Sequence, residues 1–264
     1  NSSFVNQIVD EDVAPEEVAA DPFAKLEDSI AVIPTGPEIF RPLRANAIGF
    51  DLNHTPTLTA IETARAPYAD VTWTALPLIA GGAKGGASQA VQNPAGLGTS
   101  PGTVHPATPA DVAQALDAAT PWNAPLSERR KALLRAADIY EERYGEIFAL
   151  LTREAGKGLP DCVAELREGV DFLRYYAAQA TNMPPAGLFT CISPWNFPFA
   201  IFLGQIGAAL AAGNAVLAKP AEQTPLIAHM AINVLHEAGV PLTALQLLPG
   251  AGDVGAALTS DPRI

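Results

Sequence analysis

The sequence has few cysteines and no long apolar run. Its 264 residues include two cysteines, Cys162 and Cys191, which are too few for a disulfide framework. The first residues, Asn1–Asn6, lack the basic segment that opens a signal peptide. No stretch approaches the roughly 18 apolar residues of a membrane-spanning helix. We therefore expect reduced thiols, a cytoplasmic location and no transmembrane segment.

Basic residues are also scarce, since 16 lysines and arginines face 28 aspartates and glutamates. The net charge of -12 predicts an acidic surface that repels the phosphates of nucleic acids and anionic lipids, so we expect neither as a partner. The four histidines are not grouped with cysteines or acids, so no metal site is expected. The sequence also has no Ser/His/Asp set and no nucleophile elbow.

Residues 1–50 have the composition of a tail and a linker. Eight acidic residues up to position 30 face one basic residue, Lys25, and five prolines between positions 15 and 42 break any long helix. We interpret this segment as a solvated connector. The glycines of residues 81–86 lack the Gly-Lys-Ser/Thr ending of a phosphate loop, and we interpret them as a flexible connector too.

Residues 109–180 have the spacing of helices. Pro109 and Asp111 suit the start of a first helix, and Ser127 is predicted to cap a second. Gly156 and Pro160 separate a third helix from a fourth. The predicted apolar stripes are Val112, Ala115, Leu116 and Ala119 in the first helix, Leu133, Leu134, Ala137, Tyr140 and Tyr144 in the second, Ile147, Leu150 and Leu151 in the third, and Val163, Leu166, Val170, Leu173, Tyr176 and Ala177 in the fourth.

From residue 187 onward, short apolar runs alternate with helical segments. A separate short strand is predicted earlier, over Val71–Ala75. Strand–helix alternation at this spacing predicts a parallel sheet with right-handed crossovers, and hence an α/β fold of Rossmann type with an N-terminal helical segment. The predicted strands are Leu188–Ile192, Ala215–Ala218 and Leu245–Leu248, and the predicted helices are Phe199–Ala212, a segment from Thr224 and Pro225 to Gly239, and Asp253–Leu258.

Asn196 lies in a Pro-Trp-Asn-Phe-Pro turn directly after the predicted strand Leu188–Ile192. Because two prolines stiffen the turn, its amide can be held in one direction, and a fixed N–H aimed at a developing oxyanion stabilises that charge. The alternative is an asparagine that satisfies the backbone of its own turn. The residues alone leave both interpretations open.

Lys219 and Glu222 lie at the end of the next predicted strand. One interpretation is a salt bridge, in which Glu222 neutralises a lysine on an apolar strand end. The other is a sugar site, because an acid at a strand end accepts hydrogen bonds from ribose hydroxyls in dinucleotide sites. The residues alone do not decide between them.

Gly250–Gly255 spells G-x-G-x-x-G between a strand and a helix, which suits a phosphate-facing turn at a helix N-terminus. As a lone motif it is equally compatible with a glycine-rich turn that binds nothing. Neither cysteine is predicted to be a nucleophile. Cys162 lies on a predicted helix and Cys191 in an apolar strand, so we expect both in the core.

Several of these segments together resemble the aldehyde dehydrogenase superfamily, over roughly residues 100–264. The motifs that carry this resemblance are Ser193–Pro198, Gly213–Val216, Lys219–Pro225 and Gly239–Pro241. Other segments are similar to a narrower group, the bifunctional proline utilisation A family. These are Arg153–Lys157, Ala164–Arg167 and Asp171–Ala177, together with Asn1–Asn6, which resembles the end of that family's proline dehydrogenase barrel.

The resemblance implies an aldehyde dehydrogenase-like fold that is incomplete in this chain. Residues 1–50 would hold the end of a proline dehydrogenase domain and a linker, and residues 51–264 the N-terminal, NAD-binding half of an aldehyde dehydrogenase domain. The implied reaction is NAD-dependent oxidation of L-glutamate γ-semialdehyde, formed from 1-pyrroline-5-carboxylate, to glutamate through a thiohemiacetal on a cysteine. FAD would serve the proline dehydrogenase domain of a longer, homo-oligomeric protein.

The same resemblance assigns roles to individual residues. Asn196 matches the catalytic side chain that helps to stabilise the oxyanion, and Lys219 and Glu222 match residues that hold the adenosine ribose. The implied cofactor-binding residues are Ile192, Ser193, Pro194, Trp195, Lys219, Glu222, Gly252 and Gly255.

The sequence also departs from the family. The family's Phe-Thr-Gly-Ser turn, general-base glutamate and nucleophilic cysteine are absent, so the isolated chain is expected to be inactive. The Gly250–Gly255 turn is shorter than its counterpart in the family. Two alternatives therefore stay open: another aldehyde dehydrogenase, such as one for succinic semialdehyde, and a catalytically dead NAD-binding scaffold.

Overall fold

The computed structural model describes residues 11–21, 23–24, 33–96 and 98–264. The chain divides into two compact units, Asn1–Thr35 and Gly36–Ile264. In the first unit, helix α2 (Pro15–Val18) begins with a proline and carries Glu16 and Glu17 in its first turn, where the helix dipole favours acids. The resemblance of Asn1–Asn6 to the end of a barrel concerns residues outside the described ranges.

The second unit contains a three-stranded parallel sheet. Its order is β4 (Leu188–Ile192), β5 (Ala215–Lys219) and β6 (Leu245–Leu247). The parallel sheet and its three strand positions are therefore confirmed. Every residue of β5 is buried, which explains why its sequence is a continuous apolar run up to Lys219 rather than an alternation.

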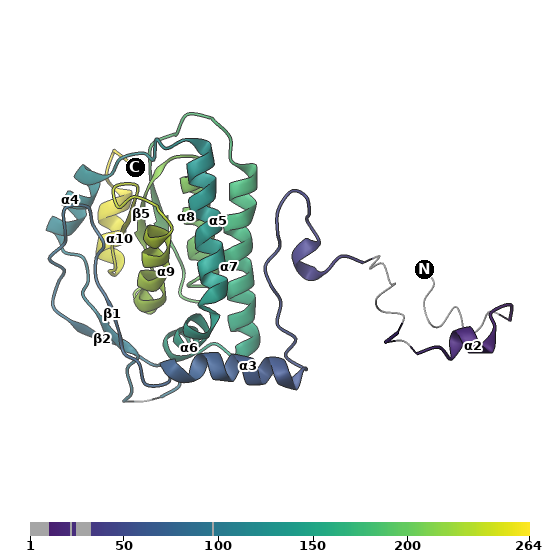
Figure 1. Ribbon diagram of the computed structural model, residues 1–264. Coiled ribbons are helices and arrows are strands. Elements are labelled where there is room, and N and C mark those ends of the chain that lie inside the picture. The colour runs from purple at the N-terminus through teal and green to yellow at the C-terminus, as the bar shows by residue number, and fades with distance from the viewer. Residues whose placement is uncertain (1–10, 22, 25–32, 97) are drawn as a thin grey trace. The chain divides into compact units, whose positions relative to one another are not determined.

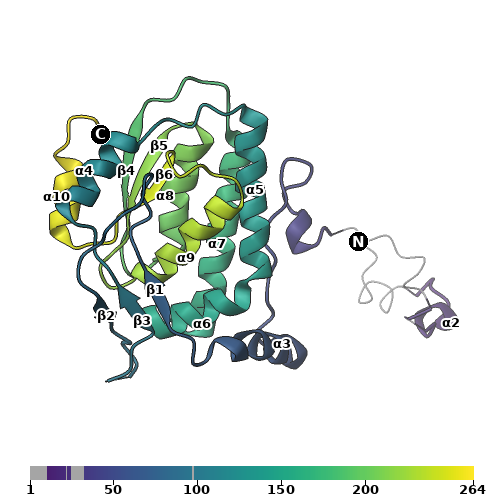
Figure 2. The same cartoon turned by 60° about the vertical axis from the view of Figure 1, so that its left-hand side comes forward.

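Helices cover both faces of this sheet (Figure 2). Successive side chains of a strand point to opposite faces, and β5 uses this to build two cores. Val216 and Ala218 belong to the larger core, with α5 (Leu126–Glu142), α7 (Leu159–Gln179), α8 (Ala200–Ala211) and α9 (Pro225–Glu237). Leu217 belongs to the smaller core, with α4 (Pro109–Ala118) and α10 (Gly252–Thr259). The result is a three-layer α/β/α arrangement, in which α5 and α7 run side by side (Figure 1).

A second, smaller sheet precedes these helices in the chain. Its order is β1 (Trp73–Ala75), β3 (Gly102–Val104) and β2 (Gln89–Val91), with β1 parallel and β2 antiparallel to β3. The strand predicted over Val71–Ala75 is confirmed by β1, whereas β2 and β3 were not predicted. Just after β1, Leu78 forms an antiparallel bridge with Leu247 of β6, with N–H···O distances of 3.0 and 2.9 Å. This bridge connects the small sheet to the edge of the parallel sheet.

Four further helices of the second unit belong to the described residues. They are η1 (Gly36–Glu38), α3 (Thr55–Arg65), η2 (Ala66–Tyr68) and α6 (Tyr144–Ala155). The sequence did not predict α3, because it buries a single residue, Ile61, and so has hardly any apolar stripe. The third predicted helix is confirmed by α6, which ends at Gly156 in the left-handed conformation.

Three details of the second predicted helix are wrong. Ser127 does not cap it, since α5 begins one residue earlier, at Leu126 after Pro125. Leu134 does not join the stripe, because the buried positions of α5 place it on the outer face, where it is 41% exposed. Tyr144 lies in the next helix, as the first residue of α6.

The C-terminal part of the predicted linker packs against the helices. Ala47 is buried, and its N–H donates to Asp171 Oδ1 of α7 at 2.8 Å. The N–H of Ile48 donates to Glu141 Oε1 of α5 at 2.7 Å. These residues are thus not a solvated connector, because acids on distant helices bind their backbone. The domain boundary at residue 50 stays a prediction. Within the described residues, no helix combines the length and apolarity that a bilayer crossing requires.

The close contact of α3 with α6 gives a first test of this packing. A Cβ added at Gly145 would lie 2.3 Å from the carbonyl oxygen of Ala64, which is backbone and cannot swing aside. We expect Gly145→Ala to lower the free energy of unfolding by about 1–3 kcal/mol. Gly49→Ala is the matched control, since nothing lies within 4 Å of its added Cβ. Urea unfolding measures both, and equal stability of the two variants would contradict the close contact.

Candidate active site

The residues singled out in the sequence gather at the carboxyl edge of the parallel sheet. Ile192 at the end of β4 pairs with Lys219 at the end of β5, and the N–H of Ser193 donates to the Lys219 carbonyl at 3.2 Å. A Cβ built at Gly255 would lie 3.4 Å from Lys219 Cε and 3.9 Å from Ile192 Cδ1. The first turn of α10 therefore touches both strand ends. In an open α/β sheet this edge is where ligands bind.

Lys219 is buried, and it is held by backbone carbonyls rather than by an acid. Its Nζ donates to the carbonyl oxygens of Pro220 and Gly250, each at 2.8 Å. Among the described residues, which include both partners, no ion pair joins Lys219 to Glu222, so the salt bridge considered from the sequence does not form. Burial lowers the pKa of Lys219, and the charges of Glu222 and Asp253 oppose that shift. A lysine has three donors, so one N–H stays available.

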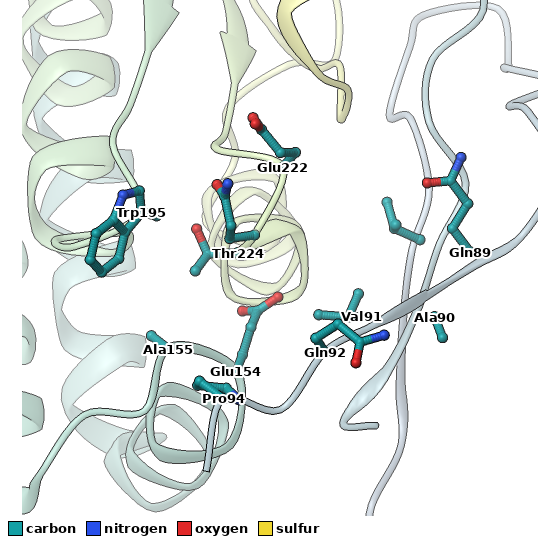
Figure 3. A pocket seen from close by; sticks show the side chains of 12 residues that line it. Gln89, Ala90, Val91, Gln92, Pro94, Glu154, Ala155, Trp195, Glu222 and Thr224 are labelled. Atoms are coloured by element: carbon teal, nitrogen blue, oxygen red, sulfur yellow. The ribbon is translucent and has the colours of Figure 1, made fainter. Parts of the chain in front are cut away.

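Glu222 is exposed and borders two neighbouring cavities. The larger, of about 340 Å³, lies between Trp195 and the β2 residues Gln89–Val91 (Figure 3). The smaller, of about 170 Å³, is also lined by Gly250 and Asp253 at the start of α10. With no hydrogen bond or ion pair to another described side chain, the Glu222 carboxylate is free to accept hydrogen bonds from a ligand.

Asn196 lies in a turn whose last residues are buried and whose middle residues are exposed to solvent. Pro198 and Phe199 are buried, whereas Trp195 is 58% exposed and Phe197 36% exposed. Asn196 is also exposed, and among the described residues its side chain makes no hydrogen bond. The alternative in which it satisfies its own turn is therefore not observed. An amide without an internal partner can donate to a bound substrate.

The glycine-rich turn is confirmed as the start of a helix. Ala251 is the N-cap residue, Gly252 the first helical residue of α10, and Asp253 an acid in its first turn. A Cβ added at Gly252 would meet nothing within 4 Å, so this backbone faces open space. Its role against a cofactor stays a prediction, as do the roles of the other site residues.

Two buried glutamates that the sequence reasoning did not single out hold the helices that follow β4 and β5. Glu165 of α7 accepts hydrogen bonds from the N–H groups of Phe199 and Ala200 at the start of α8, at 3.2 and 2.7 Å. Glu154 of α6 accepts from Leu226 and Ile227 at the start of α9, at 2.6 and 2.8 Å. Each carboxyl group replaces the N-cap side chain that its helix lacks.

Thr224 shows the same replacement. It lies at the N-cap position of α9 as predicted, yet it makes no capping hydrogen bond, and its buried hydroxyl has no partner in the described chain. Glu154 binds the free N–H groups instead. The signal in the sequence was a charge on an apolar stripe, since Glu154 continues Ile147 and Leu151.

Burial also governs the ionisable groups around the site. It raises the pKa of Glu154 to about 8, against the effect of the two backbone hydrogen bonds. Burial likewise raises the pKa of Cys191 to about 12 and raises that of Cys162. Both thiols are buried, as predicted, and neither has the lowered pKa of a thiolate nucleophile. Among the described residues, His, Cys, Asp and Glu form no group of three that could hold a metal.

Known proteins similar to this chain agree with the fold. Residues 82–264 match the aldehyde dehydrogenase family. The bifunctional protein PutA of Escherichia coli (strain K12) is 44% identical over 287 residues, which cover 100% of this chain and 22% of that protein. The chain thus spans about a fifth of the length of this curated relative.

Solved structures give the same result. A Bradyrhizobium japonicum proline utilization A (PutA) mutant matches with a TM-score of 0.74 at 37% identity, covering 100% of this chain and 26% of that one. A 1-pyrroline-5-carboxylate dehydrogenase from Thermus with bound NAD matches with a TM-score of 0.75 at 30% identity, and the match covers 83% of this chain and 48% of that one. From the family match over residues 82–264 and these relatives, the chain belongs to the aldehyde dehydrogenase family and covers part of its complete domain.

Proposed function

We propose that this chain is the NAD-binding half of an L-glutamate γ-semialdehyde dehydrogenase within a bifunctional protein of proline catabolism. That protein would convert the semialdehyde, which forms from 1-pyrroline-5-carboxylate, to glutamate. Its proline dehydrogenase domain, ending in residues 1–50, would use FAD, and the whole protein would be a cytoplasmic homo-oligomer. The names of the relatives support this proposal, since they are PutA and 1-pyrroline-5-carboxylate dehydrogenase.

The observation that carries the proposal is the placement of Asn196 and Glu222. They lie on the turns that follow two neighbouring parallel strands, and neither side chain makes a hydrogen bond or an ion pair within the described chain. Two unpaired polar groups at the ligand-binding edge of a Rossmann-type sheet suit a reacting aldehyde and a sugar.

The described residues fit a dinucleotide at this edge. The Glu222 carboxylate can accept from ribose hydroxyls, and the third N–H of Lys219 can donate to them. Gly252 offers backbone that faces open space at a helix N-terminus. Bound NAD would supply the hydride acceptor for aldehyde oxidation.

Asn196 would act on the substrate itself. Its amide N–H would donate to the aldehyde oxygen as negative charge develops there, because the stiff turn fixes its direction before reaction. The nucleophile would come from outside this chain, since both cysteines are buried with raised pKa values. We therefore propose that the isolated chain is inactive.

Cofactor preference tests the ribose site. In the full-length protein, Glu222→Gln is expected to raise the KM for NAD about 10–100-fold, because a hydrogen bond to a charged group is worth about 1.5–3 kcal/mol. The preference for NAD over NADP is expected to narrow, since the carboxylate no longer repels a 2′-phosphate.

Glu237→Gln, at the other end of α9, is the matched control, because that carboxylate pairs with Arg143 at the surface. The isolated chain is the negative control for turnover. A cofactor preference that does not move in the Glu222 variant would count against the ribose role.

A further inference from the structure

The turn that carries Asn196 is held from behind by a buried acid. Glu165 is fully buried, and its Oε2 accepts the N–H groups of both Phe199 and Ala200. These residues follow Asn196 by three and four positions. Because α8 has no side-chain cap of its own, Glu165 fixes where the helix begins and thus where the turn ends.

A lysine holds the other side of the same turn. The Nζ of Lys157 lies 2.8 Å from Glu165 Oε1, and the Lys157 side chain is only 11% exposed. The same Nζ lies 4.3 Å from the centroid of the Phe197 ring, a cation–π distance. Phe197 is the residue directly after Asn196. Lys157 therefore connects the buried acid to the neighbour of the catalytic candidate.

A buried ion pair is by itself weak evidence for a stabilising role. A buried ion pair loses the hydration of both charges, and apolar replacements are often as stable or more so. The side chain of Asn196 has no partner of its own within the described residues, so the backbone of the turn alone sets its direction. Two of the three residues that follow Asn196 touch the pair, through the Phe197 ring and the Phe199 N–H.

We propose that Glu165 and Lys157 are positioning residues for the reaction at Asn196, which they serve by fixing the turn from Phe197 to Ala200. This inference rests on the proposed function. Glu165 fixes the backbone after Asn196, and Lys157 fixes the ring beside it. Neither residue touches the substrate.

A double-mutant cycle in the full-length enzyme tests this role. The readout is the single-turnover rate of NADH formation from the semialdehyde at saturating NAD, because product release can limit steady-state turnover. Glu165→Gln is expected to lower this rate about 10–100-fold, since small misplacement of a catalytic group has effects of that size. The KM for NAD is expected to stay within about twofold, because the ribose site lies on another turn.

The decisive result is the coupling with Asn196. If Glu165 acts through Asn196, adding Glu165→Gln to Asn196→Ala causes no further loss of rate. If the double variant lost the product of the two single rate losses, the inference would be overturned, because a merely structural role of Glu165 would act independently of the Asn196 amide. Asp111→Asn is the matched control: this buried acid caps α4 and binds the backbone of Lys84 and Gly85, so its loss is expected to leave the rate unchanged.

Lys157→Met gives an independent arm in case the Glu165 variant does not fold. It removes the charge near Phe197, and the single-turnover rate is expected to fall about 3–10-fold. Adding Lys157→Met to Asn196→Ala is again expected to cause no further loss of rate. A parent enzyme that does not oxidise the semialdehyde, or an Asn196→Ala variant as fast as the parent, would refute the proposed function. A normal parent and a slow Asn196 variant, with multiplying losses, would refute only the positioning role.

Discussion

Replacing Asn196 by alanine in the full-length enzyme is expected to lower the rate of aldehyde oxidation about 10²–10³-fold, the usual effect of losing one fixed oxyanion donor. The physical reason is that the amide N–H is held before reaction and is not engaged elsewhere in the described chain. Asn196→Asp is expected to be at least as slow, since it keeps the shape, removes the donor and adds a negative charge. Single-turnover NADH formation measures both variants.

The same substitution is expected to leave stability nearly unchanged. Because the Asn196 side chain is exposed and has no hydrogen bond within the described residues, the free energy of unfolding should move by no more than about 0.5 kcal/mol. Asn123→Ala, another exposed asparagine, is the control for both measurements. A loss of stability that parallels the loss of rate would show that Asn196 is structural.

The second large effect concerns Glu154 and pH. Its side chain is buried, and burial raises the pKa of its carboxyl group from 4.5 to about 8. The folded state therefore keeps a proton that the unfolded state releases. Stability from this group is fully present below pH 4.5 and is lost as the pH rises through 8. The difference between a pKa of 4.5 in the unfolded state and about 8 in the folded state corresponds to roughly 5 kcal/mol of unfolding free energy.

Glu154→Gln is expected to remove this dependence, because an amide has no proton to release in this range. The difference in unfolding free energy between parent and variant should shift by up to about 5 kcal/mol between pH 4.5 and 8, in favour of the variant at high pH. Urea unfolding at several pH values measures it. Glu142→Gln, on the exposed surface of α5, is the control. Parallel pH curves for parent and Glu154 variant would contradict a buried, protonated carboxyl group.

The parallel sheet could be predicted because β5, which is buried at every position, leaves a continuous apolar run in the sequence. The strand Leu188–Ile192 was predicted with the bounds of β4, although only Cys191 of it is buried, because Gly187 and Pro194 frame the run. The small strand β2 left no such mark, as it has three residues, of which only Val91 is buried. Helix α3 was missed for the same reason, with Ile61 alone in the core.

The candidate site was predictable only in part. Asn196 and Glu222 stand on turns between regular segments, where polar residues draw notice. The capping by Glu165 and Glu154 could not be predicted from the sequence. Each glutamate binds backbone N–H groups 34 to 73 residues away, and no local sequence pattern connects the glutamate to the helix start that it caps. The choice between a salt bridge and a free Glu222 was also open, since only the tertiary fold shows that the carbonyls of Pro220 and Gly250 already satisfy Lys219.

The bridge between Leu78 and Leu247 has a consequence for the order in which the protein forms. Next to this bridge, the N–H of Ala80 donates to Gln246 Oε1 at 3.0 Å, and the two residues are 166 positions apart in the sequence. At about 5–20 residues per second, the ribosome makes the later partner roughly 8–33 s after the earlier one. A sheet of three-residue strands has little independent stability. During that interval the small sheet β1–β3 therefore lacks its contact with β6. The nascent chain is therefore exposed to aggregation and to chaperones until β6 has been synthesised.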